Sequence, residues 1–200
     1  MVLFVDKYLV DSSRLAGWNY SSKGIYFVTF CTYRHNKHFG EIVEGKMKLN
    51  QMGAIVDEEI KRVFSSRINF KLHKYVVMPN HVHILFEILF SVETPQRDVS
   101  NINIIDNFRR PEIATHKWQS NSVGSIINQI KSISTKRINK IPKMFGWQPR
   151  FYDEVIRSNN EFWSRYKYIE NNPKNWGKDQ YNELVETLQR NVSKEYTDLS

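Results

Sequence analysis

Two apolar runs separated by a turn of two residues constrain the fold of this chain more than any other feature. The runs FKLHKYVVM and HVHILFEILF are rich in β-branched and aromatic residues, which is typical of strands. Pro79 and Asn80, which stand between them, are turn-forming residues. Strands with so short a connection pair in antiparallel fashion, so the sequence predicts a β-hairpin at residues 70–90.

Strand and helix patterns alternate around this hairpin. GIYFVTFCTYR predicts a strand, and apolar residues recur at helical spacing after Asn50, a good N-cap. Beyond the hairpin, SVGSIINQIKSISTKRIN predicts a helix, RFYDEVIR a strand, and NNEFWSRYKYIENN a last helix that ends before Pro173. This order matches a split βαβ arrangement. We therefore expect an α+β fold: a ferredoxin-like antiparallel sheet with helices on one face, plus an added C-terminal helix.

The length of 200 residues suits one domain, which we place at residues 1–178. Residues 91–121 are polar and unpatterned, and we expect them to form a loop insertion in that domain. Residues 179–200 are also polar, and we expect them to form a C-terminal tail.

The charge balance of the chain favours a polyanionic partner. The sequence has 29 Lys and Arg against 21 Asp and Glu, for a net charge of +8. Nucleic acid is the first expectation and an anionic membrane surface the second. Cys31 is the single cysteine, so an intrachain disulfide is excluded and a reducing cytoplasm is expected. No apolar run approaches the roughly 20 residues that span a bilayer, so we expect no membrane segment.

His81 and His83 stand two positions apart in the second strand of the hairpin. Alternate residues of a strand point to the same face, so the two imidazoles should lie side by side, away from the core. We expect that face to be open apart from the last helix. Two imidazoles can bind one divalent metal ion, but the site needs a further ligand. The alternative is a pair of exposed histidines with no ligand.

The predicted last helix carries Tyr168 and Asn172, which are four residues apart and so share a face. Phe162, Tyr166 and Ile169 form its expected buried stripe, and Tyr168 lies about 120° around the helix from that stripe. The amide oxygen of Asn172 is a suitable ligand for Mg²⁺ or Mn²⁺. The phenol one turn away could then reach a phosphate at the metal. The alternative is an amphipathic surface tyrosine.

The segment VVMPNHVH resembles the HUH motif (His, hydrophobic residue, His) of single-tyrosine transposases. It is specifically similar to the branch of REP-associated tyrosine transposases, which are relatives of small insertion-sequence transposases. The segments SVGSIINQIKSISTKRIN, WQPRFYDEVIR and YIENNPKNW resemble further parts of that family. The resemblance extends over roughly residues 12–178 and leaves out the insertion and the tail.

The resemblance implies a metal-dependent endonuclease and strand transferase that acts on single-stranded, hairpin-forming DNA through a 5′-phosphotyrosine. It assigns His81, His83 and Asn172 to Mg²⁺ or Mn²⁺, although the insertion-sequence branch has glutamine in place of Asn172. It assigns the nucleophile to Tyr168. Tyr152, in WQPRFYDEVIR, is the alternative nucleophile, but its segment predicts a strand with no ligand at helical spacing.

Basic and aromatic residues of the second half are the expected DNA contacts. They are Lys131, Lys136, Arg137, Trp147, Arg150 and Arg157. Two rival functions remain open at this stage: a catalytically idle DNA-binding protein derived from a transposase, and a hydrolase that uses water at the same histidines. A homodimer, and a site shared between its subunits, also remain open.

Overall fold

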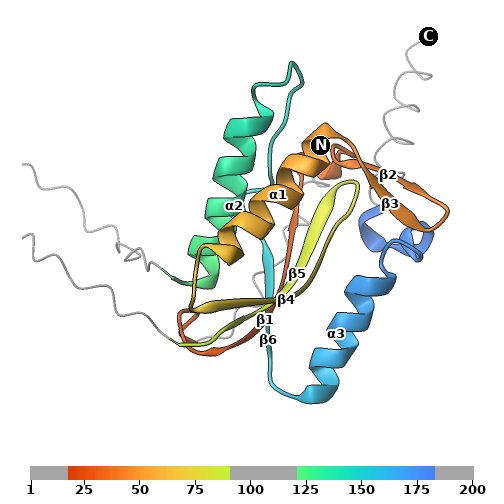
Figure 1. Ribbon diagram of the computed structural model, residues 1–200. Helices are drawn as coiled ribbons and strands as arrows, with labels where there is room; N and C mark the ends of the chain where they lie inside the picture. The colour runs from red at the N-terminus through yellow and green to blue at the C-terminus, as the bar shows by residue number, and fades with distance from the viewer. Residues whose placement is uncertain (1–17, 91–120, 183–200) are drawn as a thin grey trace, which may run out of the picture.

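The computed structural model of the chain describes residues 18–90 and 121–182. An antiparallel sheet of four strands lies at its centre, in the order β4-β5-β1-β6 (Figure 1). The strands are β1 (Gly24–Cys31), β4 (Phe70–Val77), β5 (His81–Ile88) and β6 (Tyr152–Ile156). The predicted α+β class and the predicted antiparallel sheet are confirmed.

Two helices cover one face of this sheet. They are α1 (Gln51–Ser65) and α2 (Val123–Ile138), and each begins at a capped residue. The side chain of Asn50 accepts a hydrogen bond from the backbone N–H of Gly53, and Ser122 caps α2 in the same way. The helices and the sheet bury a large apolar cluster between them. From β5 it receives Val82, Ile84, Phe86 and Ile88.

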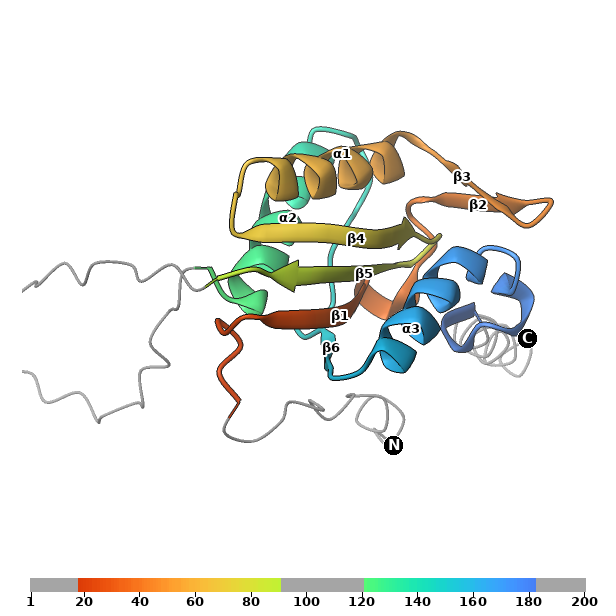
Figure 2. The ribbon, with the colours of Figure 1, turned by 60° about the horizontal axis from the view of Figure 1, so that its bottom comes forward.

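The third helix, α3 (Asn159–Asn171), lies against the opposite face of the sheet, over β4 and β5 (Figure 2). It begins where the side chain of Ser158 caps the backbone N–H of Glu161. The apolar cluster on this face is small, and its buried members are Phe27, Leu85, Ile156 and Ile169. A short 3-10 helix, η3 (Trp176–Lys178), follows α3. The prediction that the last helix is added to a ferredoxin-like plan is confirmed.

A second, two-stranded sheet stands apart from the main one (Figure 1). Its strands are β2 (Gly40–Val43) and β3 (Lys46–Leu49), which follow the 3-10 helix η2 (Tyr33–His35). Gly40 has φ +138°, and a Cβ atom there would lie 2.1 Å from the carbonyl oxygen of Lys48. Glycine is therefore required where the chain enters this hairpin.

Residues 91–120, most of the predicted insertion, lie outside the described residues, as does 183–200 of the predicted tail. The boundary at 178 stays a prediction. Asp179 and Asn182, the first and last described residues of that tail, are nevertheless buried. Among the described helices, none has the length and hydropathy that crossing a bilayer would require.

Candidate active site

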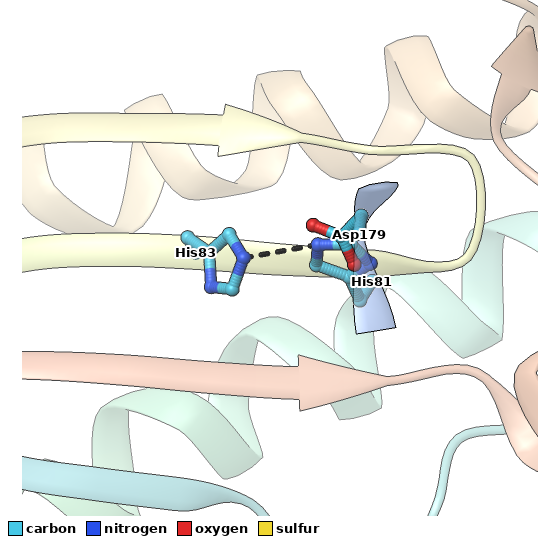
Figure 3. A group of neighbouring side chains, drawn as sticks. All are labelled: His81, His83 and Asp179. Atoms are coloured by element: carbon cyan, nitrogen blue, oxygen red, sulfur yellow. Dashed lines mark hydrogen bonds between the residues drawn. The ribbon is translucent and has the colours of Figure 1, made fainter. Parts of the chain in front are cut away.

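His81 and His83 lie side by side at the start of β5 and point to the face that carries α3. Their Nε2 atoms are 3.0 Å apart (Figure 3). Both side chains are buried, with exposed fractions of 0% and 1%. The last helix covers this face, as expected, but the residues after it cover these imidazoles as well, so the face is not open. The alternative of two exposed strand histidines is excluded by the same burial.

Asn80 determines which nitrogen of the His81 ring carries the proton. Its side-chain Nδ2 donates hydrogen bonds to two backbone carbonyls, those of His35 at 3.0 Å and Tyr181 at 2.9 Å. The Oδ1 atom must then face His81 Nδ1, which lies 2.8 Å away and donates to it. A proton on Nδ1 leaves a lone pair on Nε2, the atom that faces His83.

His83 is held by β1, the neighbouring strand. Its Nδ1 atom lies 2.6 Å from the hydroxyl oxygen of Thr29, its register partner in the sheet. The ring of Phe27 stacks on the His83 ring at 5.4 Å between centroids. These contacts fix the orientation of the imidazole, as the outer partners of metal-binding histidines do.

Asp179 completes a group of three side chains with these histidines (Figure 3). Ligand atoms of the three residues all lie within 4.8 Å of one another. Asn172 adjoins the group: its Nδ2 donates to Asp179 Oδ2 at 3.0 Å, whereas its buried Oδ1 has no hydrogen-bond partner. An orphaned oxygen of this kind is the sort of atom that a cation would satisfy.

The spacing of the two imidazoles suits a metal ion. Two nitrogens bound at about 2.1 Å and at a right angle to each other would lie about 3.0 Å apart. The observed separation of the Nε2 atoms is 3.0 Å. Two lone pairs at that distance repel unless a proton or a cation lies between them. The group of His81, His83 and Asp179 could therefore hold a metal ion.

Burial also keeps both imidazoles neutral. Desolvation lowers the pKa of His83 to about 3, with a smaller effect of the Arg165 charge. Desolvation and the neighbouring His83 hold the pKa of His81 well below its usual value. Neutral imidazole is the form that binds a metal. The two histidines are therefore ready ligands at neutral pH.

Tyr168 lies beside His83, with 5.1 Å between the ring centroids. Its ring also contacts Phe27, so Tyr168 packs on the sheet together with Phe162, Tyr166 and Ile169. Our inference that Tyr168 lies off the packed side of its helix is wrong. Burial and the Asp179 charge raise the pKa of Tyr168 to about 12, while Arg165 and Asn172 act in the opposite direction.

A pocket of about 380 Å³ opens beside these side chains. Charged and polar residues of α3 and of the segment after it form its lining: Arg165, Tyr168, Asn172, Asn175, Lys178, Asp179 and Gln180. The pocket therefore brings the phenol, the two candidate oxygen ligands Asn172 and Asp179, and two cationic side chains to one space.

Tyr152, the alternative nucleophile, lies on the same face of the sheet but further from the histidines. It pairs with Thr29 across β1 and β6, so β1 separates it from His83. Its hydroxyl donates to Glu154 Oε2 at 3.3 Å. The geometry thus favours Tyr168, although the assignment of either tyrosine stays a prediction.

Two of the expected DNA contacts pack within the protein: Lys131 is buried and Trp147 is partly buried. The Nζ atom of Lys131 donates to the carbonyls of Gln148 and Arg150. The Trp147 ring packs on Phe30, and its Nε1 donates to the carbonyl of Lys131. These side chains hold the segment before β6 against α2. The prediction for Lys131 is therefore wrong, whereas the contact of Trp147 with DNA stays a prediction.

The four other basic residues have different surroundings. Arg137 forms ion pairs with Glu58 and Glu59 of α1, on the side of the sheet away from the histidines. Lys136, Arg150 and Arg157 are exposed. Their contact with DNA stays a prediction.

No family model matches this chain. A protein of Haemophilus influenzae whose function is uncharacterised is 31% identical over 170 residues, which cover 84% of this chain and 91% of that protein. The structure of a REP-associated tyrosine transposase bound to a REP hairpin matches with a TM-score of 0.52 and 20% identity, over 82% of this chain and 74% of that one. A candidate transposase from Deinococcus radiodurans gives a TM-score of 0.40, too low to carry an argument.

Proposed function

We propose that this chain, which belongs to the same family as the Haemophilus influenzae protein and shares the fold of a REP-associated tyrosine transposase, is a metal-dependent DNA endonuclease and strand transferase. Its substrate is single-stranded DNA with a hairpin, and its nucleophile is Tyr168. One observation carries the proposal: two neutral imidazoles, an orphaned amide oxygen and a tyrosine ring converge at a single place on the sheet.

Four side chains supply the candidate ligands. His81 and His83 each offer Nε2, because their Nδ1 atoms are engaged by Asn80 and Thr29. Oxygen comes from Asn172 Oδ1 and from Asp179. This mixed nitrogen and oxygen set suits Mg²⁺ or Mn²⁺, and such an ion, when bound, polarises the scissile phosphate.

The chemistry is a transesterification. The Tyr168 oxygen attacks phosphorus, the bond from phosphorus to the 3′ oxygen breaks, and that oxygen leaves as a hydroxyl with the proton that the phenol loses. The product is a 5′-phosphotyrosine, and attack by a DNA 3′-hydroxyl reverses the step. One phosphodiester of the DNA is exchanged for one between the DNA and Tyr168, so the reaction needs no ATP.

The DNA partner is supported by charge and by the fold. The net charge is +8, and the exposed Lys136, Arg150 and Arg157 are available for phosphate contacts. The REP-associated tyrosine transposase of the same fold was solved with a REP hairpin bound. We extend a hairpin substrate to this chain, and we place the protein in the cytoplasm, where its DNA would be.

Trapping a covalent adduct tests the proposal. The full chain is incubated in Mn²⁺ with end-labelled DNA hairpins whose flanking sequences are randomised, and adducts are separated under denaturing conditions. Wild type and Tyr152→Phe should both form the adduct. Tyr168→Phe should form none while still binding the hairpins, because only one oxygen is removed.

Other results would assign the site differently. If the wild type binds hairpins but does not cleave them, the protein is a catalytically idle DNA-binding protein. Cleavage without an adduct would mean that water is the nucleophile. An adduct that survives in Tyr168→Phe and disappears in Tyr152→Phe would move the nucleophile to β6.

A further inference from the structure

Arg165 is a cation of α3 that lines the same pocket as Tyr168. It precedes Tyr168 by three residues on α3, so the two side chains are neighbours on the helix surface. The pocket also reaches Asn172, a candidate metal ligand. Arg165 therefore borders the same pocket as the phenol and a candidate metal ligand.

Two residues of the sheet, Glu154 and Phe27, hold the guanidinium of Arg165 in place. Its Nη2 atom lies 2.6 Å from Oε2 of Glu154, which comes from β6. Its Cζ atom lies over the Phe27 ring, 5.0 Å from the centroid. The same ring stacks on His83, so Phe27 sets the distance between the cation and the metal group. An arginine that is already ordered loses less conformational entropy when it binds an anion.

The Arg165 side chain remains accessible despite these contacts. It is 34% exposed, whereas Glu154 is 26% exposed. A guanidinium has five N–H donors, and a single carboxylate oxygen engages only part of them. Planar pairs of donors match the oxygens of a phosphate, which makes arginine the preferred side chain for that group.

We propose that Arg165 binds a non-bridging oxygen of the scissile phosphate while Tyr168 attacks it, and that Glu154 and Phe27 position its guanidinium for this contact. The inference rests on the proposed function. In phosphoryl transfer the charge is spread over the equatorial oxygens, which must be stabilised from more than one side. The histidines occupy one side of Tyr168, and Arg165 supplies a fixed charge from its own helix.

A purely structural role is the competing explanation for Arg165. Its ion pair with Glu154 joins α3 to β6 and could serve only to hold the helix on the sheet. In that case, removing either partner should have the same effect. If Arg165 binds the phosphate, removing it should slow the reaction far more than removing Glu154, which holds Arg165 in place and also accepts a hydrogen bond from Tyr152.

The test measures the rate of adduct formation with a hairpin that the wild type cleaves. Arg165→Met should slow the reaction by about 100-fold, the usual effect of losing one donor to a transition-state oxygen. Glu154→Ala should slow it by less than about tenfold. Lys167→Met, a loss of an exposed charge on another face of α3, should leave the rate unchanged.

Binding gives a second measure that does not depend on cleavage. In a Tyr168→Phe background, replacing the mapped scissile phosphate by neutral methylphosphonate should weaken DNA binding. Adding Arg165→Met should reduce that difference, because one of the groups that contact the charged phosphate is gone.

The inference is overturned if Arg165→Met reacts within about threefold of wild type, if Glu154→Ala is as slow as Arg165→Met, or if the methylphosphonate difference is unchanged without Arg165. An absence of any adduct from the wild type would instead overturn the proposed function, and the inference with it.

Discussion

The two faces of the sheet differ in the side chains that they bury. The face under α1 and α2 is an extended apolar cluster, and β5 contributes alternate residues such as Val82 and Ile84 to it. The face under α3 has only a small apolar cluster, and β5 presents His81 and His83 to it. One strand thus serves both faces through the alternation of its side chains.

The difference shows how a small fold separates stability from chemistry. Apolar burial on the α1 and α2 face supplies most of the hydrophobic stabilisation. The α3 face instead buries groups that are costly to desolvate, including two imidazoles and the orphaned oxygen of Asn172. Neighbours in sequence should therefore respond to substitution in opposite ways.

The largest expected effect is on activity at the α3 face. His83→Ala should lower the rate of adduct formation by about 10³-fold or more, because a bound metal supplies several kcal/mol of transition-state stabilisation. Hairpin binding should persist, since phosphate contacts carry most of the affinity. Gel-shift and cleavage assays on one preparation would measure both. If His83→Ala cuts DNA at the wild-type rate in Mg²⁺ or Mn²⁺, His83 is not a metal ligand.

Ile84, the next residue along β5, should show the reverse behaviour. It is fully buried against α1 and α2, so Ile84→Ala should lower the free energy of unfolding by about 3 kcal/mol. The rate per folded molecule should change little. Denaturant unfolding together with the cleavage assay would measure both quantities. A loss of activity as large as that of His83→Ala would mean that the two faces are not separable.

A smaller effect is expected from the hydroxyl that holds His83. Thr29→Val keeps the shape of the side chain but removes the partner of His83 Nδ1. We expect the apparent affinity for Mn²⁺ to fall by about tenfold, as with other outer partners of ligating histidines. The shift of the melting temperature with Mn²⁺ concentration would report it. An unchanged Mn²⁺ dependence would show that Thr29 does not orient the ligand.

The smallest effect concerns Lys131, the buried cation on the apolar side. Burial lowers its pKa from 10.5 to about 8. Between those values the unfolded chain binds more protons than the folded one, so stability should rise with pH, by at most about 1.4 kcal/mol per unit. Lys131→Met should lack this rise. Unfolding of both proteins at pH 7.5 and 9.5 would measure it, and parallel curves would contradict the assignment.

The elements of the fold were predictable because each has a clear periodicity. The hairpin of β4 and β5, the cap at Asn50 and the end of α3 all follow from local sequence. The sequence also identified His81 and His83 as a pair on one side of their strand. Period and capping are local properties, so tertiary contacts did not overrule them.

The rest of the site depends on contacts between distant residues. Asp179 stands in a polar stretch with no periodicity, and only the folded chain brings it to the histidines. Tyr168 packs on the sheet because α3 lies over two strands, which widens its buried arc beyond a single stripe. Lys131 resembled a DNA contact by residue type, but it is buried and its amine donates to backbone carbonyls.

The contacts of Asn80 have a consequence for protein synthesis. Its amide joins the carbonyls of His35 and Tyr181, residues that leave the ribosome at very different times. The histidines are made early, but their oxygen partners at Asn172 and Asp179 follow about ninety residues later, counted along the chain. A nascent or prematurely terminated chain would therefore carry the two imidazoles without the candidate oxygen ligands. DNA cleavage should begin only after translation has passed Tyr181.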